Sequence, residues 1–243
     1  MIYLTGDIHG HHSISKFSTD KFPIGKSLTR EDYVIICGDF GLVWADTAEE
    51  RYWLKWLEGK PWTTLWIDGN HENFDRLREY PEEDWHGGRV QRISEHVLHL
   101  CRGYVFEIGG KSFFAFGGAE SHDKEYRVLG KTIWNEELPS PEEMERGRRS
   151  LEAAGWKVDY VVSHSLPQHM QEQMFNADEY EGSILTRYFD EIAERLDFGM
   201  WFSGHYHTSY LLAPQYCLLY HQIIELADSG FLLASPKMGG LLG

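Results

Sequence analysis

Five short polar clusters in this sequence combine residue types that can bind a metal ion. Each follows a short apolar run that is typical of a buried strand. In chain order the clusters are GDIHG at Gly6–Gly10, GDFG at Gly38–Gly41, GNHE at Gly69–Glu72, SH at Ser163–His164 and GHYH at Gly204–His207. Any one of them could also be a turn, because glycine tolerates positive φ angles and Asp hydrogen-bonds its own backbone. Together they predict a site for metal chemistry.

Open α/β sheets bind ligands at the carboxyl ends of their strands, where these clusters are expected to meet. Without a cation, so many polar and ionisable groups at one edge would repel one another and lose hydration. Two divalent cations would relieve both costs. Mixed nitrogen and oxygen donors suit Mn, Fe, Zn or Ni, whereas Ca and Mg prefer oxygen ligands alone. The candidate ligands are Asp7, His9, Asp39, Asn70, His164, His205 and His207.

Two of the clusters space their candidate ligands two residues apart. These pairs are Asp7 with His9 and His205 with His207. In an extended segment, alternate side chains point to the same face, so both members of a pair could reach one site. We therefore expect extended backbone at these positions.

The clusters need strands and helices to bring them together. Thr47-Ala48-Glu49-Glu50 and Ser140-Pro141-Glu142-Glu143 fit capping boxes and predict helix starts, with Gly59 as a stop for the first helix. Apolar residues from Ile184 to Leu196 recur with helical spacing. Segment Val97–Phe116 alternates and turns at Gly109-Gly110, which predicts a β-meander with a hairpin. The expected buried strands are Ile2–Thr5, Tyr33–Cys37, Thr64–Ile67, Val158–Val162 and Met200–Phe202.

Strands and helices are intermixed along the chain, with antiparallel character in the middle and after Ser209. This pattern favours an α/β sandwich, two sheets covered by helices, over a purely parallel doubly wound sheet. The 243 residues show no repeat or linker, so we expect a single domain over residues 1–243. Loop insertions are expected roughly over 73–96 and 119–140.

The five clusters, in this order, resemble those of the calcineurin-like metallophosphoesterase superfamily, and in particular its small bacterial and phage members. The family pattern reads D-x-H, GD, GNH followed by E or D, a lone His, and GHxH. Here it runs from Asp7 to His207 and so covers most of the chain. The resemblance implies a metallophosphoesterase-type α/β sandwich with two mixed β-sheets flanked by helices.

The resemblance also implies two adjacent divalent transition-metal ions. We expect Mn2+, with Fe, Zn and Ni as alternatives. The first ion would be held by Asp7, His9 and His207. The second would be held by Asn70, His164 and His205.

Two further roles follow from the same resemblance. Asp39 would bridge both ions with its carboxylate. His71 would be no ligand, but would face the substrate and protonate the leaving oxygen or stabilise charge. The implied reaction is hydrolysis of a phosphomonoester or small phosphodiester by a metal-activated hydroxide.

The second cluster departs from one branch of the family. Ser/Thr protein phosphatases extend it to GDxVDRG, whereas this chain reads GDFGLVW, with Leu42 and Val43 where Asp and Arg would stand. The acidic partner of His71 and one phosphate-binding arginine are therefore missing from their usual place. This argues against protein-phosphatase specificity.

A second segment, Gly117–Arg127, resembles a stretch of some phage and bacterial members. There His122, Lys124 and Arg127 could contact the substrate phosphate or its leaving group, together with Asn70 and His71. The alternative is a surface turn in which Asp123 pairs with Lys124 or Arg127.

The formal net charge of −15 argues against long nucleic acid as the substrate, because an acidic surface repels phosphate backbones. A small phosphorylated substrate remains compatible, since bound cations offset charge locally. No apolar run is long enough to span a bilayer and no leader is apparent, so we expect no membrane partner and a cytoplasmic location. Cys37, Cys101 and Cys217 are isolated and are expected as buried apolar residues. Protein partners are left open.

Two other functions remain as alternatives. One is a nuclease or cyclic-nucleotide phosphodiesterase with the same dinuclear site. The other is a non-catalytic scaffold with this fold, although relatives of that kind usually degrade the ligand set, which is intact here.

Overall fold

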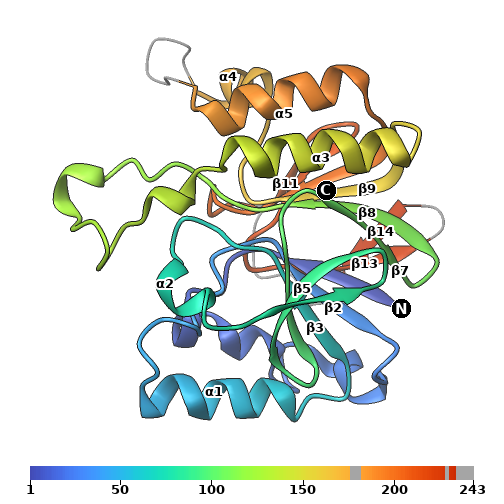
Figure 1. The fold of residues 1–243 in the computed structure, drawn as a ribbon. Coiled ribbons are helices and arrows are strands. Elements are labelled where there is room, and N and C mark those ends of the chain that lie inside the picture. The colour runs from blue at the N-terminus through green and yellow to red at the C-terminus, as the bar shows by residue number, and fades with distance from the viewer. Residues whose placement is uncertain (176–181, 228–229, 234–243) are drawn as a thin grey trace.

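The structure is a computed structural model, and it describes residues 1–175, 182–227 and 230–233. These residues form four layers (Figure 1). Helix α1 and several short 3-10 turns cover one face of a first sheet, which packs on a second sheet, and α3, α4 and α5 cover the outer face of the second sheet. The expected α/β sandwich of two mixed sheets flanked by helices is confirmed.

The first sheet has eight strands within the described residues, in the order β14-β13-β1-β2-β3-β6-β5-β4. Its centre is parallel, from β1 to β6, and its edges are antiparallel. Leu4 lies opposite Ile35, and Ile35 opposite Leu65, so this register builds one apolar row. The strands are β1 (Ile2–Thr5), β2 (Tyr33–Ile36), β3 (Thr63–Trp66), β4 (Glu82–Trp85), β5 (Gly88–Ser94), β6 (Val97–Leu100), β13 (Ile223–Ala227) and β14 (Gly230–Leu233).

The second sheet has six strands within the described residues, in the order β11-β12-β10-β9-β8-β7. It also has parallel central pairs and antiparallel edge hairpins. The strands are β7 (Tyr104–Ile108), β8 (Lys111–Phe116), β9 (Lys157–Ser163), β10 (Asp197–Ser203), β11 (Tyr210–Ala213) and β12 (Tyr216–Leu218). The β7–β8 hairpin turns at Gly109 and Gly110, as the sequence predicts.

The helices begin where local capping predicts. The Thr47 side chain accepts from the Glu50 backbone N–H at the start of α1, and Ser140 and Glu143 form a reciprocal capping box at α3. The helices are α1 (Ala48–Glu58), α2 (Phe74–Leu77), α3 (Pro141–Ala153), α4 (Gln168–Met174) and α5 (Ile184–Arg195). The 3-10 turns are Gly10–His12, Ile14–Phe17, Pro23–Ser27, Lys124–Tyr126 and Asn135–Glu137. No helix among the described residues combines the length and apolarity needed to cross a membrane.

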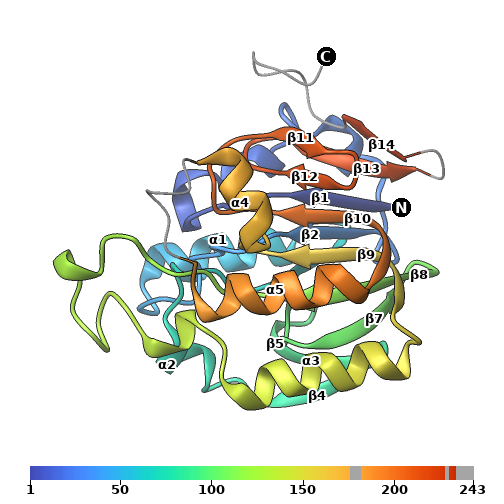
Figure 2. The same cartoon turned by 90° about the horizontal axis from the view of Figure 1, so that it is seen from above.

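Apolar residues on alternate sides of the central strands form separate cores. Leu4 of β1 and Ile35 of β2 lie between the two sheets, whereas Tyr3 and Val34 face the α1 layer. A third cluster joins the second sheet to α3, α4 and α5. The three cysteines are unpaired and buried, as expected. These packed layers hold the parallel strands so that their carboxyl ends point to one side, the side on which segment 119–140 projects (Figure 2).

The segment over 73–96 differs from the loop that the sequence predicts. It forms α2 and the β4–β5 hairpin, which extends the first sheet. The hairpin turns at His86 and Gly87, both with positive φ, the geometry of a tight two-residue turn. Its outer strand, β4, is polar because it forms the exposed edge of the sheet, and there Glu83 pairs with Arg92 of β5. A polar edge strand lacks the apolar alternation by which strands are predicted.

The expected β-meander over Val97–Phe116 is divided between the two sheets. Strand β6 belongs to the first sheet, and β7 and β8 belong to the second. The chain crosses between them at Gly103, where φ is 81° and an added Cβ would meet the backbone of α3 within 2.9 Å. Alternation along one stretch predicts strands but does not state which sheet each one joins.

Candidate metal centre

Four of the predicted ligands meet at the carboxyl ends of β1 and β2 and at the turn after β10. One donor atom from each of Asp7, His9, Asp39 and His207 lies within 4.8 Å of the others. Asp7 Oδ2 is 3.2 Å from Nε2 of His207 and 3.6 Å from Nε2 of His9. This group contains the three residues expected at the first metal ion and the residue expected to bridge.

The other predicted ligands lie on the far side of Asp39. Asp39 Oδ2 is 3.7 Å from Nε2 of His9 and 3.3 Å from Nε2 of His164. The His205 ring packs against the His164 ring with centroids 5.0 Å apart. Asn70 is buried, and its Nδ2 donates to Oγ of Ser121 over 3.0 Å. It follows Gly69, where an added Cβ would stand 2.8 Å from His164 Nε2. Asp39 therefore lies between the two halves of the predicted ligand set, where a bridging carboxylate would have to be.

Three buried atoms test whether these residues fit a pair of metal ions. Asn70 Oδ1 has no hydrogen-bond partner among the described residues, and Asp7 Oδ2 and His164 Nε2 have only the close imidazole and carboxylate contacts given above, none of them with hydrogen-bond geometry. A buried polar atom left in this way costs about 1–3 kcal/mol. All three are ligand atoms in the predicted set, and a divalent cation would satisfy them. The residues present therefore fit the two ions.

The backbone here is not the extended chain expected from the two-residue spacing. His9, Asp39, His205 and His207 have φ between 45° and 70°, in the left-handed region. The paired ligands therefore lie on tight turns beyond their strands, and the argument from alternating strand faces is wrong. Non-glycine residues in this region are strained and cluster at functional sites, where the surrounding structure holds them in place.

Glycines in the clusters leave room for the ligand side chains. A Cβ on Gly69 would stand 2.1 Å from Asp39 Oδ1, and one on Gly204 would stand 2.4 Å from Asp7 Oδ1. Any larger residue at either position would displace a carboxylate of the centre.

The charges of the centre depend on one another. Burial would raise the pKa of Asp7, but the charge of His164 and the contacts with His207 and His9 hold it well below its usual range. Burial would lower the pKa of His164, but Asp39 and Asp7 raise it to about 10. Burial and the charge of His164 lower the pKa of His205 to about 3. Burial would likewise raise the pKa of Asp39, but the charge of His164 holds it below its usual range, so both carboxylates are ionised and able to bind cations.

Two buried ionisable residues that sequence reasoning missed support the ligand loops. Lys16 donates to the backbone oxygens of Gly6, Asp7 and Tyr220, and so ties the Asp7 turn to the loop before β13. Glu72 accepts from the backbone N–H groups of Phe40 and Gly41, the residues after Asp39. Glu72 belongs to the GNHE cluster and could have been suspected, whereas nothing in the sequence distinguishes Lys16.

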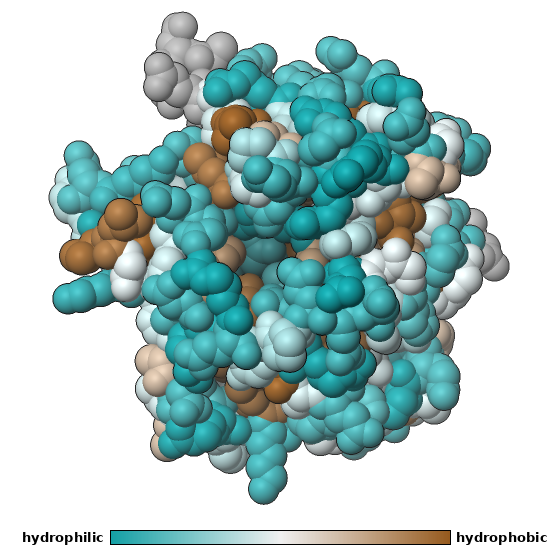
Figure 3. Space-filling view, in the orientation of Figure 1, coloured by the Kyte–Doolittle hydropathy of each residue, from teal (hydrophilic) through white to brown (hydrophobic). Residues whose placement is uncertain are grey.

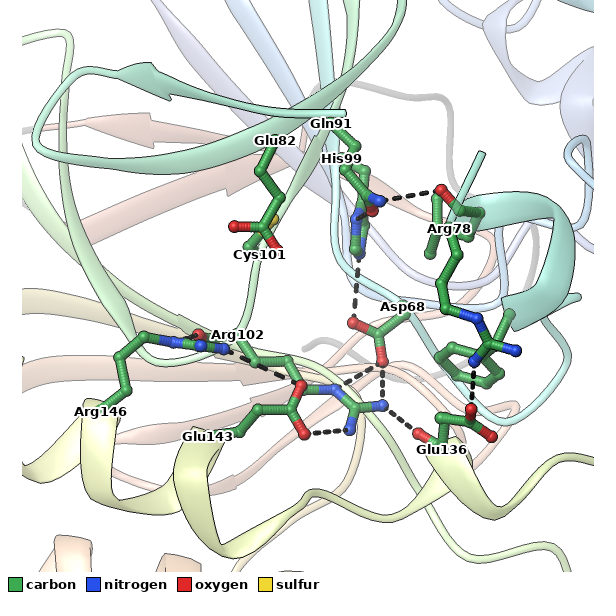
Figure 4. A pocket seen from close by; sticks show the side chains of 12 residues that line it. Asp68, Arg78, Glu82, Gln91, His99, Cys101, Arg102, Glu136, Glu143 and Arg146 are labelled. Carbon is green, nitrogen blue, oxygen red and sulfur yellow. Dashed lines mark hydrogen bonds and ion pairs between the residues drawn. The ribbon is translucent and has the colours of Figure 1, made fainter. Parts of the chain in front are cut away.

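A buried ionic network lies behind the Asn70 loop. Asp68 precedes Gly69 and Asn70, and its Oδ2 accepts from Nε of Arg102 over 2.8 Å. Nη2 of Arg102 also donates to Asp68 and to the backbone oxygen of Glu136. His99 joins the network through Asp68 Oδ1, at 3.2 Å (Figure 4). The network borders a cavity of about 220 Å3 that opens between α2 and α3, where the surface is hollowed (Figure 3). Arg102 thus links Asp68, which follows strand β3, to Glu136 in segment 119–140.

Loss of Arg102 is expected to destabilise the fold. Arg102 is 4% exposed and Asp68 2%, so Arg102→Met would leave a buried carboxylate without its cation. We expect the free energy of unfolding to fall by about 3–5 kcal/mol, measured by urea denaturation. Arg148→Met, which breaks the half-exposed pair with Glu191, is the matched control and should cost less than about 1 kcal/mol. Equal losses in the two variants would contradict a structural role for the buried pair.

The residues of segment 117–127 that were predicted to contact substrate differ in whether they reach the candidate metal centre. Arg127 reaches the centre, and its Nη2 lies 3.1 Å from Nε2 of His71 while its Nε pairs with Asp123 at 2.7 Å. The exposed His122 ring lies 5.9 Å from the His205 ring. Lys124 instead pairs with Glu120. The Asp123–Arg127 pair fits the surface-turn alternative, and Arg127 also lies beside His71. The substrate roles of His122, Lys124 and Arg127 stay predictions.

A second group of possible ligands, Glu58, Glu95 and His96, lies near the start of β6. Glu58 Oε2 already accepts from Ser94 Oγ and the His96 backbone N–H, and Oε1 lies 2.7 Å from His96 Nδ1. Both carboxylate oxygens of Glu58 therefore have hydrogen-bond partners. Unlike the candidate metal centre, this group has no buried side-chain atom without a partner among the described residues.

Comparison with protein-family models matches residues 1–209 to the model described as calcineurin-like phosphoesterase. The matched range contains all five clusters and Arg127, and it ends two residues after His207. Comparison with curated proteins found no match.

Proposed function

Because the chain belongs to the calcineurin-like phosphoesterase family, we propose that it hydrolyses a phosphomonoester or a small phosphodiester at a dinuclear metal centre. One observation carries the proposal. Donor atoms from turns far apart in the sequence converge around Asp39, and three of them are buried without a hydrogen bond in the described structure. Such an arrangement is costly unless cations occupy it.

The proposed ligand sets keep the division that the family pattern implies. Asp7, His9 and His207 would hold one ion. Asn70, His164 and His205 would hold the other, with Asp39 between them. When bound, such ions supply an activated water nucleophile and neutralise phosphoryl charge. We propose Mn2+, with Fe, Zn and Ni as alternatives, on the mixed nitrogen and oxygen donors.

His71 and Arg127 are the proposed contacts to the reacting phosphoryl group. The His71 backbone N–H donates to Asp39 Oδ1 over 2.8 Å, which fixes His71 next to the ligands without making its ring one of them. Burial and the neighbouring Arg127 charge lower the pKa of His71, although Asp39 opposes them. A phosphoryl dianion bound beside both side chains would raise that pKa again. His71 could then hold the proton that it gives to the leaving oxygen.

Metal analysis and a substrate panel test the proposed function. Protein purified without chelator is expected to contain about two transition-metal ions per chain. The panel is p-nitrophenyl phosphate, bis-p-nitrophenyl phosphate, cyclic nucleotides and single-stranded DNA, each with added Mn2+. Hydrolysis that EDTA abolishes and Mn2+ restores would support the proposal. Protein that neither holds nor regains metal, and hydrolyses nothing, would instead support the scaffold alternative.

The same panel separates the remaining enzyme alternatives. A preference for the diesters or for single-stranded DNA would support the phosphodiesterase or nuclease. We propose a small substrate, because the net charge of −15 disfavours a long polyanion. The cytoplasmic location is likewise a proposal, supported by three buried, unpaired cysteines. Cell fractionation would test it.

Arg127→Ala is expected to weaken substrate binding more than it slows the chemical step. The guanidinium is held by Asp123 at the face of His71, where it can bind a phosphoryl oxygen. We expect KM to rise roughly tenfold with a smaller fall in kcat, measured by steady-state kinetics, since a hydrogen bond to a charged group is worth about 1.5–3 kcal/mol. Arg148→Ala, which removes an arginine that pairs with Glu191 on the outer helices, is the matched control. An unchanged KM in the Arg127 variant would remove Arg127 from the substrate contacts.

A further inference from the structure

A second cavity adjoins the candidate metal centre at His9. It has a volume of about 340 Å3, within the range of small-molecule sites. His9 belongs both to the wall of this cavity and to the group of metal ligands. A phosphoester bound at the centre could therefore extend its leaving group into the cavity.

The cavity has an apolar and aromatic lining next to a glycine backbone. Leu42, Trp44 and Trp53 line it, and both tryptophans are half-buried. Gly10 and Gly41 pass so close to each other that a Cβ on Gly10 would stand 2.7 Å from the Gly41 oxygen. Indole side chains beside a flat backbone surface favour a planar aromatic group, because such groups stack on one another.

The Trp44 wall is fixed before any ligand binds. The Trp44 backbone N–H donates to Glu50 Oε2 over 3.1 Å, and its backbone oxygen accepts from Asn73 Nδ2 over 2.7 Å. The Trp44 ring packs edge-on against Trp134. Trp53 is held on α1 by packing against the core below the first sheet. Preformed walls reduce the entropy cost of binding a rigid ligand.

The charges around the cavity restrict the ligand further. No Lys or Arg occurs among the described residues that line it. Two glutamates line the cavity. Glu49 Oε2 lies 3.9 Å from His11 Nδ1, and the Glu50 carboxylate accepts hydrogen bonds from the backbone N–H groups of Trp44, Ala45 and Asp46. Apart from the imidazoles of His9, His11 and His12, a second phosphate would meet the two glutamates and no Lys or Arg among the lining residues, so an uncharged leaving group is favoured.

We propose that this cavity binds the leaving group of the substrate, and that the leaving group is an uncharged, planar aromatic alcohol of the size of a nucleoside. The inference rests on the proposed phosphoesterase function and specifies its substrate class. Trp44 and Trp53 are the specificity-determining residues. Leu42 contributes an apolar surface at the position where the protein phosphatases carry a polar side chain.

The first experiment compares two phosphomonoesters in the Mn2+-loaded enzyme. Adenosine 5′-monophosphate carries an aromatic leaving group, and glycerol 2-phosphate carries a compact one. Trp53→Ala is expected to lower kcat/KM for the adenosine ester about tenfold relative to the glycerol ester, as for one lost base-stacking contact. Trp53→Phe should keep most of that ratio. Trp85→Ala, which removes a half-buried tryptophan of β4 outside the cavity, should leave it unchanged.

The second experiment uses adenosine alone and metal-free protein, so that it does not depend on catalysis. Calorimetry is expected to detect adenosine binding to the wild type and its weakening in Trp53→Ala and Trp44→Ala. One result would overturn the inference and leave the proposed function intact. The enzyme would hydrolyse both esters and bind no adenosine, and Trp53→Ala would lower kcat/KM equally for the two esters. Hydrolysis of neither ester by the metal-loaded wild type would count against the proposed function, and the adenosine titration would still decide whether the cavity binds an aromatic group.

Discussion

Replacing Asp39 with Asn is expected to lower kcat/KM by roughly a thousandfold or more and to reduce the bound metal below two ions per chain. Asp39 Oδ2 lies 3.7 Å from Nε2 of His9 and 3.3 Å from Nε2 of His164, so its charge serves both halves of the centre. Asn has the same shape, and its amide oxygen can still accept the His71 N–H. The loss would therefore report the missing charge rather than a collapsed loop. Steady-state kinetics and metal analysis of the same preparations measure it.

Two comparisons make the Asp39 result interpretable. Asp197→Asn removes an exposed carboxylate that pairs with Lys157, and it should leave both activity and metal content unchanged. Circular dichroism should show that Asp39→Asn remains folded, which matters because Asp39 is also the buried partner of His164. An Asp39→Asn protein that keeps two ions and most of its activity would contradict the bridging role.

His71→Ala is expected to lower kcat roughly 10²- to 10⁴-fold while leaving metal content and KM nearly unchanged. The ring of His71 contacts Arg127 and packs edge-on against the ring of the predicted ligand His9, whereas its backbone N–H donates to Asp39. Alanine retains that N–H. The variant therefore removes the proposed proton donor and spares the ligands.

The leaving group provides a sharper test of the same role. If His71 protonates the leaving oxygen, the loss in kcat should be small for p-nitrophenyl phosphate, whose leaving group departs without a proton. It should be large for an alkyl ester such as glycerol 2-phosphate. His169→Ala, which alters an exposed histidine paired with Asp190, is the control. Equal losses for both esters, or loss of metal, would show that His71 acts otherwise.

Much of the fold follows from local sequence. Strand β1 has the bounds Ile2–Thr5 that its apolar run predicts, and α1 and α3 begin after Thr47 and Ser140. Capping and short apolar runs depend on residues close together in the chain, so the sequence contains all the information that they need. The ligand set is of the same kind, because each cluster directly follows its strand.

The sheet order and the 73–96 hairpin depend on pairing between distant segments. Strand β6 joins one sheet and β7 the other, although both alternate in the same way. Strand β4 is the exposed edge of the first sheet, where polar residues replace the apolar signal. Local sequence patterns do not predict which sheet a strand joins, because this depends on pairing with a strand from a distant segment.

The sequence by itself predicted the candidate ligands, because ligand chemistry requires particular side chains, and four of them meet in the structure. Only the tertiary structure decided how they are held. The left-handed turns at His9 and His207, the buried Lys16 and the Asp68–Arg102 pair join segments far apart in the chain. The aromatic cavity beside His9 likewise needs Trp44 and Trp53 from a loop and a helix that fold against the Asp7 turn. Such features arise from packing in three dimensions, where the burial and pairing of each group depend on neighbours that sequence spacing does not specify.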